Sequence, residues 1–566
     1  MSTPKTVDEW LVEIDAGLEY RKIFAREASW RKIELNYLND PQSDTAIGPN
    51  LVYSMGDSLV SSLMVPDPEF LVAPTRSNGV DKAPIVEAID NTLTTEMNLK
   101  RYIDMSTLHG FLYGSLILKI GYDSEFGWAP FYDIGQGNNL GMTTTQFDTK
   151  TGYRIETPDT RPGWPWVRPV LPHTFIVPWG TVFLEDAPWA CHEVIRHIDY
   201  IKKDPKYRNT KGLQGQLSMK DWMESHLTVG KDKQRARLSN MAEFHVEPEY
   251  VKMYEIRNRM TGEIIVITRD HDKFLRKAPD AIQLACGMPF VHGTMSQHPR
   301  SFWSTPPAYY LGQIQATQFD ISLQAEKERR ISVLKFLYRK GALSESALAR
   351  MLSGDVGAAE AVDNQYPLND VIATMPKGNS YDHIVYADNN RRDARDAIGF
   401  SRNQLGEFDS SSRRTAREAT FVAQGSGLRT SKRGQVVSNM YVDTMRKVNG
   451  LVFNFWTIPR EIMVDSAWVD YVGSDLAGHY QYDVSLSTKR VLSKAERKIE
   501  ALSLLPMLMQ IPGINVQAVF QDLINASSDP SFESMLGQVA KGGQGQGQQQ
   551  QGSQQQLPTI PGTGRA

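Results

Sequence analysis

Apolar residues recur at helical spacing through much of the first 110 positions. Between residues 7 and 38 they return every three or four positions among charged residues, which predicts one amphipathic helix. Residues 50–64 and 83–108 carry similar patterns and predict two more helices. Compact apolar runs predict a strand at 70–74 and, with its lead-in, a buried strand at 110–122.

Between residues 128 and 300 the pattern changes to short β-like runs separated by Pro, Gly, Trp and Tyr. These runs lie at 166–170, 174–177, 251–256 and 263–268. Two polar stretches interrupt them. Residues 136–163 predict a hairpin or an exposed loop, and residues 202–240 contain a predicted short helix at 219–226.

Helical patterns return after Ser304, where a Thr-Pro-Pro sequence is a favourable helix start. The helix predicted at 305–330 has a narrow apolar face made of Leu311, Ile314, Ile321 and Ala325. So narrow a stripe favours sideways packing against like helices over burial in a core. A small mixed insert follows, strand-like at 331–338, and then a polar helix at 388–405.

The longest helical pattern runs from about residue 415 to Trp456. Its apolar positions are Val437, Tyr441, Met445, Val448 and Val452, spaced by three or four residues. Gly425 and Gly427 predict a kink, since an interior glycine weakens a helix by about 1 kcal/mol. Pro459 ends the pattern.

The C-terminal part has a strand-like run at 480–486 and a capping box formed by Ser493 and Glu496. Helical segments follow at 513–525 and 530–540. From residue 541 the chain is rich in Gly and Gln and is predicted to be disordered.

The order of helical and strand-like segments predicts an α+β protein, and its 566 residues predict two to four structural units. The net charge of −3 excludes a whole-molecule basic field, so any contact with nucleic acid has to be local. Cys191 and Cys286 lie far apart in sequence and predict no disulfide framework. The longest apolar run, at 111–120, is too short to span a bilayer, and we expect a soluble intracellular protein without a membrane partner.

Motifs of catalysis are missing from the sequence. There is no GxxxxGK[ST] phosphate loop and no GxSxG elbow. His192 and His197 are five residues apart, one too many for an HExxH zinc site, so they fall on different faces of a helix or a strand. The sequence 270–272 reads as a charged turn. We therefore expect no catalytic residues, no metal and no cofactor.

The strongest chemical feature is a basic segment at the head of the long helix. Between residues 411 and 433 six basic residues stand against one acidic residue. The loop candidates are Ser410, Ser411, Ser412, Arg413, Arg414 and Arg417, and a second basic patch comprises Arg429, Lys432 and Arg433. Arginines form charge-assisted bonds with phosphate oxygens. No aromatic residues interleave with them, which favours loose contact with a duplex backbone over stacking on single strands. The alternative is a solvated helix face paired with carboxylates such as Asp393, Asp396 or Glu407.

The order of these segments resembles that of the portal proteins of tailed bacteriophages. The segments that carry the resemblance are 50–53 with the stop at 66–68, 110–122, 171–178, 184–189, Phe302 with Trp303, 415–418, and a capped helix set with a Gln-rich tail. The resemblance implies a portal fold with a mixed α/β wing, a two-helix stem, a small α/β clip, a long kinked helix and a helical crown. The implied boundaries are wing 1–304, stem helices 305–330 and 379–405, clip 331–378, tunnel loop 406–414, long helix with return to the wing 415–490, crown 491–540 and tail 541–566.

The resemblance also implies a function. Twelve subunits would form a ring at one capsid vertex, with a central channel for double-stranded DNA during packaging and ejection. The implied partners are the terminase large subunit, head-tail adaptor or tail proteins at the clip, and the major capsid protein, with scaffolding protein around the wing. The protein would reside in the virion, after assembly in the host cytoplasm. Two other hypotheses remain open: another head-tail adaptor or minor capsid protein, and a nucleic-acid-processing enzyme.

Overall fold

The structure is a computed structural model. It describes residues 4–38, 48–65, 68–122, 163–218, 248–332, 336–338, 345–346, 372–374, 381–399, 416–464 and 467–485, and for 329–332, 336–338, 372–374, 381–382, 416–431 and 485 it describes the backbone alone. The chain divides into two compact units, Met1–Leu486 and Ser487–Ala566, and every described residue belongs to the first.

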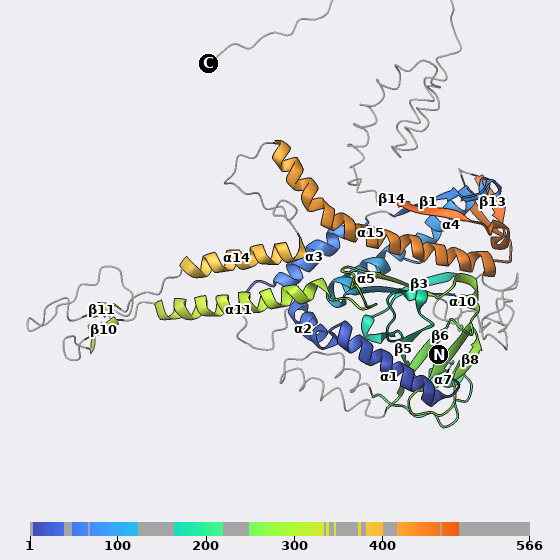
Figure 1. Ribbon diagram of the computed structural model, residues 1–566, viewed down its shortest axis with the longest axis horizontal. Coiled ribbons are helices and arrows are strands. Elements are labelled where there is room, and N and C mark those ends of the chain that lie inside the picture. Colours follow the sequence, from blue (N-terminus) through green and yellow to red (C-terminus); the bar gives the residue numbers. More distant parts are fainter. Residues whose placement is uncertain are drawn as a thin grey trace, which may run out of the picture. The chain divides into compact units, whose positions relative to one another are not determined.

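The described part is a mixed α and β structure, as the sequence predicts (Figure 1). Its longer helices are α1 (Val7–Phe24), α2 (Glu27–Leu38), α3 (Leu51–Leu63), α4 (Ala83–Glu96), α5 (Leu99–Tyr113), α7 (Ile198–Lys203), α10 (Ala281–Cys286), α11 (Pro307–Ser332), α14 (Tyr381–Ile398) and α15 (Ala416–Phe455). None of the helices in the described part combines the length and apolar content needed to cross a membrane.

The strands form small antiparallel sheets. They are β1 (Glu69–Pro74), β2 (Ser115–Tyr122), β3 (Pro165–Pro169), β4 (Phe175–Ile176), β5 (Trp189–His197), β6 (Tyr250–Asn258), β7 (Glu263–Ile267), β8 (Arg276–Pro279), β9 (Phe290–Thr294), β10 (Phe336–Tyr338), β11 (Ile372–Thr374), β12 (Arg460–Val464), β13 (Ala467–Tyr471) and β14 (Tyr480–Ser485). One sheet has the order β3-β2-β9 and another the order β4-β5-β6-β7-β8, while β1 pairs with β14, β10 with β11 and β12 with β13.

Two helices predicted as continuous are broken in the structure. The helix predicted at 7–38 is divided into α1 and α2, and the helix predicted at 83–108 into α4 and α5. At each break a non-glycine residue adopts a left-handed backbone, Arg26 and Asn98, each with φ of 53°. Because the apolar period continues across both breaks, the periodicity in the sequence does not reveal them.

The predicted buried strand is confirmed over β2, where every residue is buried, but its lead-in is wrong. Residues 110–113 belong to α5, and Gly114 ends that helix with φ of +90°. A Cβ at Gly114 would lie 2.5 Å from the Ser304 carbonyl oxygen, so only glycine fits this turn.

The other helix boundaries differ in detail. Among the described residues of 331–338, α11 extends through Ser332 and β10 is the strand part. The helix predicted at 388–405 lies at 381–398 and ends at Gly399, which has φ of +83°. The strands predicted near 70, 166, 174, 251, 263 and 480 are confirmed. The predictions for 136–163, 219–226 and everything after 486 lie outside the described residues.

The helix α15 provides the largest single contribution to the core around β2. Its predicted apolar stripe is confirmed: Val437, Tyr441, Met445, Val448 and Val452 are all buried. The helix contacts all three strands of the β3-β2-β9 sheet. It also contacts β14, which pairs with the N-terminal strand β1. Helix 416–455 is continuous through Gly425 and Gly427, and the kink predicted there stays a prediction.

Hydrogen bonds also connect segments of the first unit that are far apart in the sequence. Asn91 on α4 accepts from the Phe70 amide at 2.8 Å, so the outer edge of β1 is protected by side chains. On the other side of β1, β14 pairs with it over its full length, bringing residues after α15 back to the N-terminal part. Asn449 on α15 donates to buried Asp90 on α4 at 3.1 Å.

Replacing Met445 with alanine should destabilise the first unit by about 2–5 kcal/mol, because it removes a fully buried side chain and leaves a cavity. The exposed Gln435, on the same helix, is the matched control, and Gln435→Ala should change stability by less than about 0.5 kcal/mol. Urea unfolding followed by tryptophan fluorescence measures both. Equal effects from the two substitutions would contradict the anchoring role of the stripe.

Candidate functional site

Helices α11 and α14 form an antiparallel pair (Figure 1). Near one end His383 Nε2 lies 2.8 Å from Glu328 Oε2. Farther along, Asn390 donates to the Gln318 side chain and to the Ile314 carbonyl, each at 3.0 Å. Sequence numbers rise along one helix as they fall along the other, so the two helices are the arms of a helical hairpin.

Helix α11 has the predicted narrow apolar face, and some of its polar side chains form hydrogen bonds within the chain. Gln315 and Gln318 are buried, and Gln315 accepts from the Leu51 amide at the start of α3 at 2.6 Å. Glutamine side chains fasten the base of α11 to α3 and α14. The sideways packing against like helices that the narrow stripe favours stays a prediction.

Near its start, α14 carries three apolar residues that the described part of the subunit leaves exposed. Ile384, Val385 and Tyr386 are consecutive, and their exposed fractions are 62%, 41% and 64%. A run of exposed apolar residues on a soluble helix usually contacts a partner.

The predicted loop residues lie at the head of α15. Ser410, Ser411, Ser412, Arg413 and Arg414 lie outside the described residues. Arg417 and Arg429 belong to α15, where the helical backbone is described without side chains.

The two members of the second basic patch whose side chains are described have different surroundings. Lys432 is exposed, whereas Arg433 donates from Nη1 to the Ile398 carbonyl oxygen at 2.8 Å. Ile398 is the last residue of α14, where carbonyls lack helical partners and the helix dipole favours a cation. Arg433 therefore fastens α15 to the end of α14, and the structure does not bring it together with Lys432 as one patch.

Helix α15 continues in the N-terminal direction well past the contact between Arg433 and Ile398. Seventeen residues separate Arg433 from the start of α15 at Ala416, about 26 Å of helix at about 1.5 Å per residue. The N-terminal part of α15 therefore extends well beyond its contact with α14.

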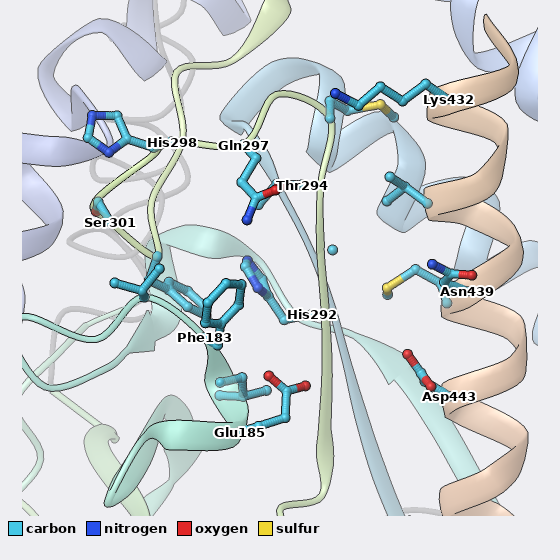
Figure 2. Close-up of a pocket in the computed structure, with 17 residues that line it drawn as sticks. Phe183, Glu185, His292, Thr294, Gln297, His298, Ser301, Lys432, Asn439 and Asp443 are labelled. Atoms are coloured by element: carbon cyan, nitrogen blue, oxygen red, sulfur yellow. The ribbon is translucent and has the colours of Figure 1, made fainter. Parts of the chain in front are cut away.

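A groove of about 330 Å³ runs between α15 and the loop after β9 (Figure 2). Figure 2 shows Lys432 at one end and Glu185 with Asp443 at the other. Asp443 is held by Arg446 at 2.8 Å; burial raises its pKa, while the nearby Arg446 and Lys447 oppose the rise. The lining combines apolar and polar side chains in similar measure between the oppositely charged ends.

The floor of the groove offers no catalytic pair. His292 stacks on Phe302 with ring centroids 3.8 Å apart, and burial lowers its pKa to about 3. Its Nε2 has no hydrogen-bond partner in the described part of the chain. A neutral histidine packed on an aromatic ring, with no nucleophile bound to it, serves packing.

A buried network of charges joins the two larger sheets, and sequence reasoning missed it. Lys119 on β2 lies 2.9 Å from Glu255 on β6, and Arg257 lies 2.7 Å from Glu255 and 2.6 Å from Asp280. Burial alone would raise the pKa of Glu255, but the Lys119 and Arg257 charges hold it well below its usual range. The available signal was Lys119 itself, a single cation inside an otherwise apolar strand. Two positive and two negative groups compensate each other, so the network is structural.

The histidines of the false HExxH sequence do not form a metal site. His192 lies on β5 opposite Glu255, whereas His197 caps the start of α7 by accepting from the Asp199 amide at 3.2 Å. Within the described ranges, no three His, Cys, Asp or Glu side chains are grouped to hold a metal. The sequence 270–272 forms an exposed turn, as expected.

Comparisons with known proteins identify no family. No family model and no curated protein matches the chain. Among solved structures, the chain is similar to one described as the neck of an empty GTA particle computed with C6 symmetry. The TM-score is 0.35 and the identity 8%, over 88% of this chain and 93% of that chain. At this level of likeness, the function has to be inferred from the chain's own residues.

Buried histidines make stability depend on pH. Burial, with the nearby His173, lowers the pKa of His109 to about 4, whereas the unfolded residue titrates near 6.5. The unfolded state therefore binds the proton first, and the stabilisation present above pH 6.5 is lost as the pH falls towards 4. His109→Gln should reduce the loss of stability between pH 7 and pH 5 by about 2 kcal/mol. Urea unfolding at the two pH values measures this, and an unchanged pH dependence would contradict it.

Proposed function

We propose that this chain is a portal-type subunit that forms a ring around a channel for double-stranded DNA. One observation carries the proposal: the antiparallel hairpin α11–α14 is followed by α15, whose C-terminal half is buried while about 26 Å of helix continues past the contact with α14. In this proposal the predicted basic loop would sit at the head of a helix whose other half is buried in the core.

Assembly into a ring would use surfaces that one subunit leaves uncovered. The exposed run Ile384–Val385–Tyr386 on α14 is one such surface, and it supports lateral contact between helical hairpins. A surface that contacts a different surface on the next copy generates a closed ring when the rotation closes. The dodecamer expected from the resemblance is part of this proposal.

Contact with DNA would be local and weak. The chain has a net charge of −3, while the segment from 411 to 433 has six basic residues and one acidic residue. Each phosphate contact adds salt-sensitive affinity, and a ring repeats every contact. A slightly acidic ring with one local basic segment in each subunit would guide a moving duplex without holding it.

The same proposal includes the partners of the subunit and assigns it no catalytic activity. The subunit would act as a conduit without catalytic activity, served by the terminase large subunit as motor. Head-tail adaptor or tail proteins would bind the insert between α11 and α14, with capsid and scaffolding proteins around the sheets. The protein would reside at the capsid vertex after assembly in the host cytoplasm.

The substitutions Arg413→Glu and Arg414→Glu together should leave rings intact and reduce the DNA retained per particle by several fold. Each subunit would exchange two positive charges, which attract phosphates, for two negative charges, which repel them. DNA content of purified particles and ring counts in electron micrographs provide the two readouts.

The matched control is Lys202→Glu with Lys203→Glu, an adjacent exposed pair on α7 that makes the same charge change away from the loop. Particles with the control substitutions should package normally. Normal DNA content in the arginine variant would eliminate the channel role of Arg413 and Arg414.

A further inference from the structure

The hairpin β12–β13, directly after α15, has one face that the described residues leave uncovered. Met463 and Trp468 are directly opposite in the strand register, and their exposed fractions are 57% and 71%. The other face of the hairpin carries Ile462, which packs against the main core. Exposed tryptophan is uncommon on a monomer and is enriched where partners bind.

The same face carries two carboxylates side by side. Glu461 and Asp470 are the next directly opposite pair, and both are exposed. Like charges directly opposite on antiparallel strands destabilise the pairing. Neither carboxylate has an ion-pair partner in the described part of the chain. A cationic surface that also covers the indole would relieve both costs.

A second face of the same chain has the complementary composition. Arg101 and Met105 lie one helical turn apart on α5, and both are exposed. Beside them, exposed Arg168 on β3 places its guanidinium 4.6 Å from the centre of the Tyr102 ring. Strand β3 contacts α5, and Arg101 directly precedes Tyr102 on that helix, so Arg101 and Arg168 belong to one face. Burial lowers the pKa of Arg168, and the Arg101 charge lowers it further.

We infer that the β12–β13 hairpin of one copy docks on the α5–β3 face of the next copy. Glu461 and Asp470 would pair with Arg101 and Arg168, and Trp468 would cover Met105. This contact deepens the ring proposed above and rests on it. Each face has what the other lacks: two adjacent carboxylates meet two adjacent guanidinium groups, and an exposed indole meets an exposed thioether.

The two faces are different surfaces of one subunit, so the contact is heterologous. Such contacts repeat head to tail and form a ring when the rotation closes. Charge pairs across an interface choose the partner and the register, and close pairs in known complexes contribute more than exposed pairs within one chain.

The test uses two charge-reversed versions of the full chain. One carries Glu461→Arg with Asp470→Arg, and the other carries Arg101→Glu with Arg168→Glu. Each version alone juxtaposes like charges, so the fraction of chain in rings should fall by more than about tenfold. A one-to-one mixture restores opposite charges at every contact, so rings of alternating subunits should return. Negative-stain micrographs and sedimentation velocity measure the ring fraction.

Trp468→Ala tests the apolar part, with Trp179→Ala as control, since Trp179 is also an exposed indole but lies in another loop. We expect Trp468→Ala alone to weaken rings, with unchanged unfolding midpoints for both variants. Rings from either charge-reversed version alone, or no rings from a mixture of two folded versions, would overturn the contact. Wild-type chain without rings would instead count against the proposed function.

Discussion

The structure depends on the burial of one side of the last half of α15. Five apolar residues from Val437 to Val452 lie in the main core, and through them the helix contacts the β3-β2-β9 sheet and the strand pair β1–β14. Helix α15 therefore cannot move without disturbing the centre of the unit. Its first seventeen residues lie before the Arg433 contact with α14.

Much of the fold could be predicted because it follows from periodicity. The stripe on α15 and the buried strand β2 were readable, since burial selects apolar residues at regular spacing. The breaks at Arg26 and Asn98 were not, because a left-handed residue other than glycine leaves no mark in the hydrophobic pattern. The ends of α14 were missed for a similar reason: its first turns carry apolar residues that the subunit does not bury.

The candidate site was only partly predictable. The basic character of 411–433 is plain in sequence, but the separation of Lys432 from Arg433 depends on which way each side chain points from one helix. The buried Lys119–Glu255–Arg257–Asp280 network joins residues up to 161 positions apart, so no local pattern announces it. Buried charges of this kind hold the two sheets in one arrangement.

Electron microscopy of the purified full chain, viewed end-on, tests the central claim most directly. The account predicts closed rings of about twelve subunits around a hole wide enough for duplex DNA. A population of monomers or compact dimers, under conditions in which the chain is folded, would contradict it. That result would favour the hypothesis of an adaptor protein or of an enzyme.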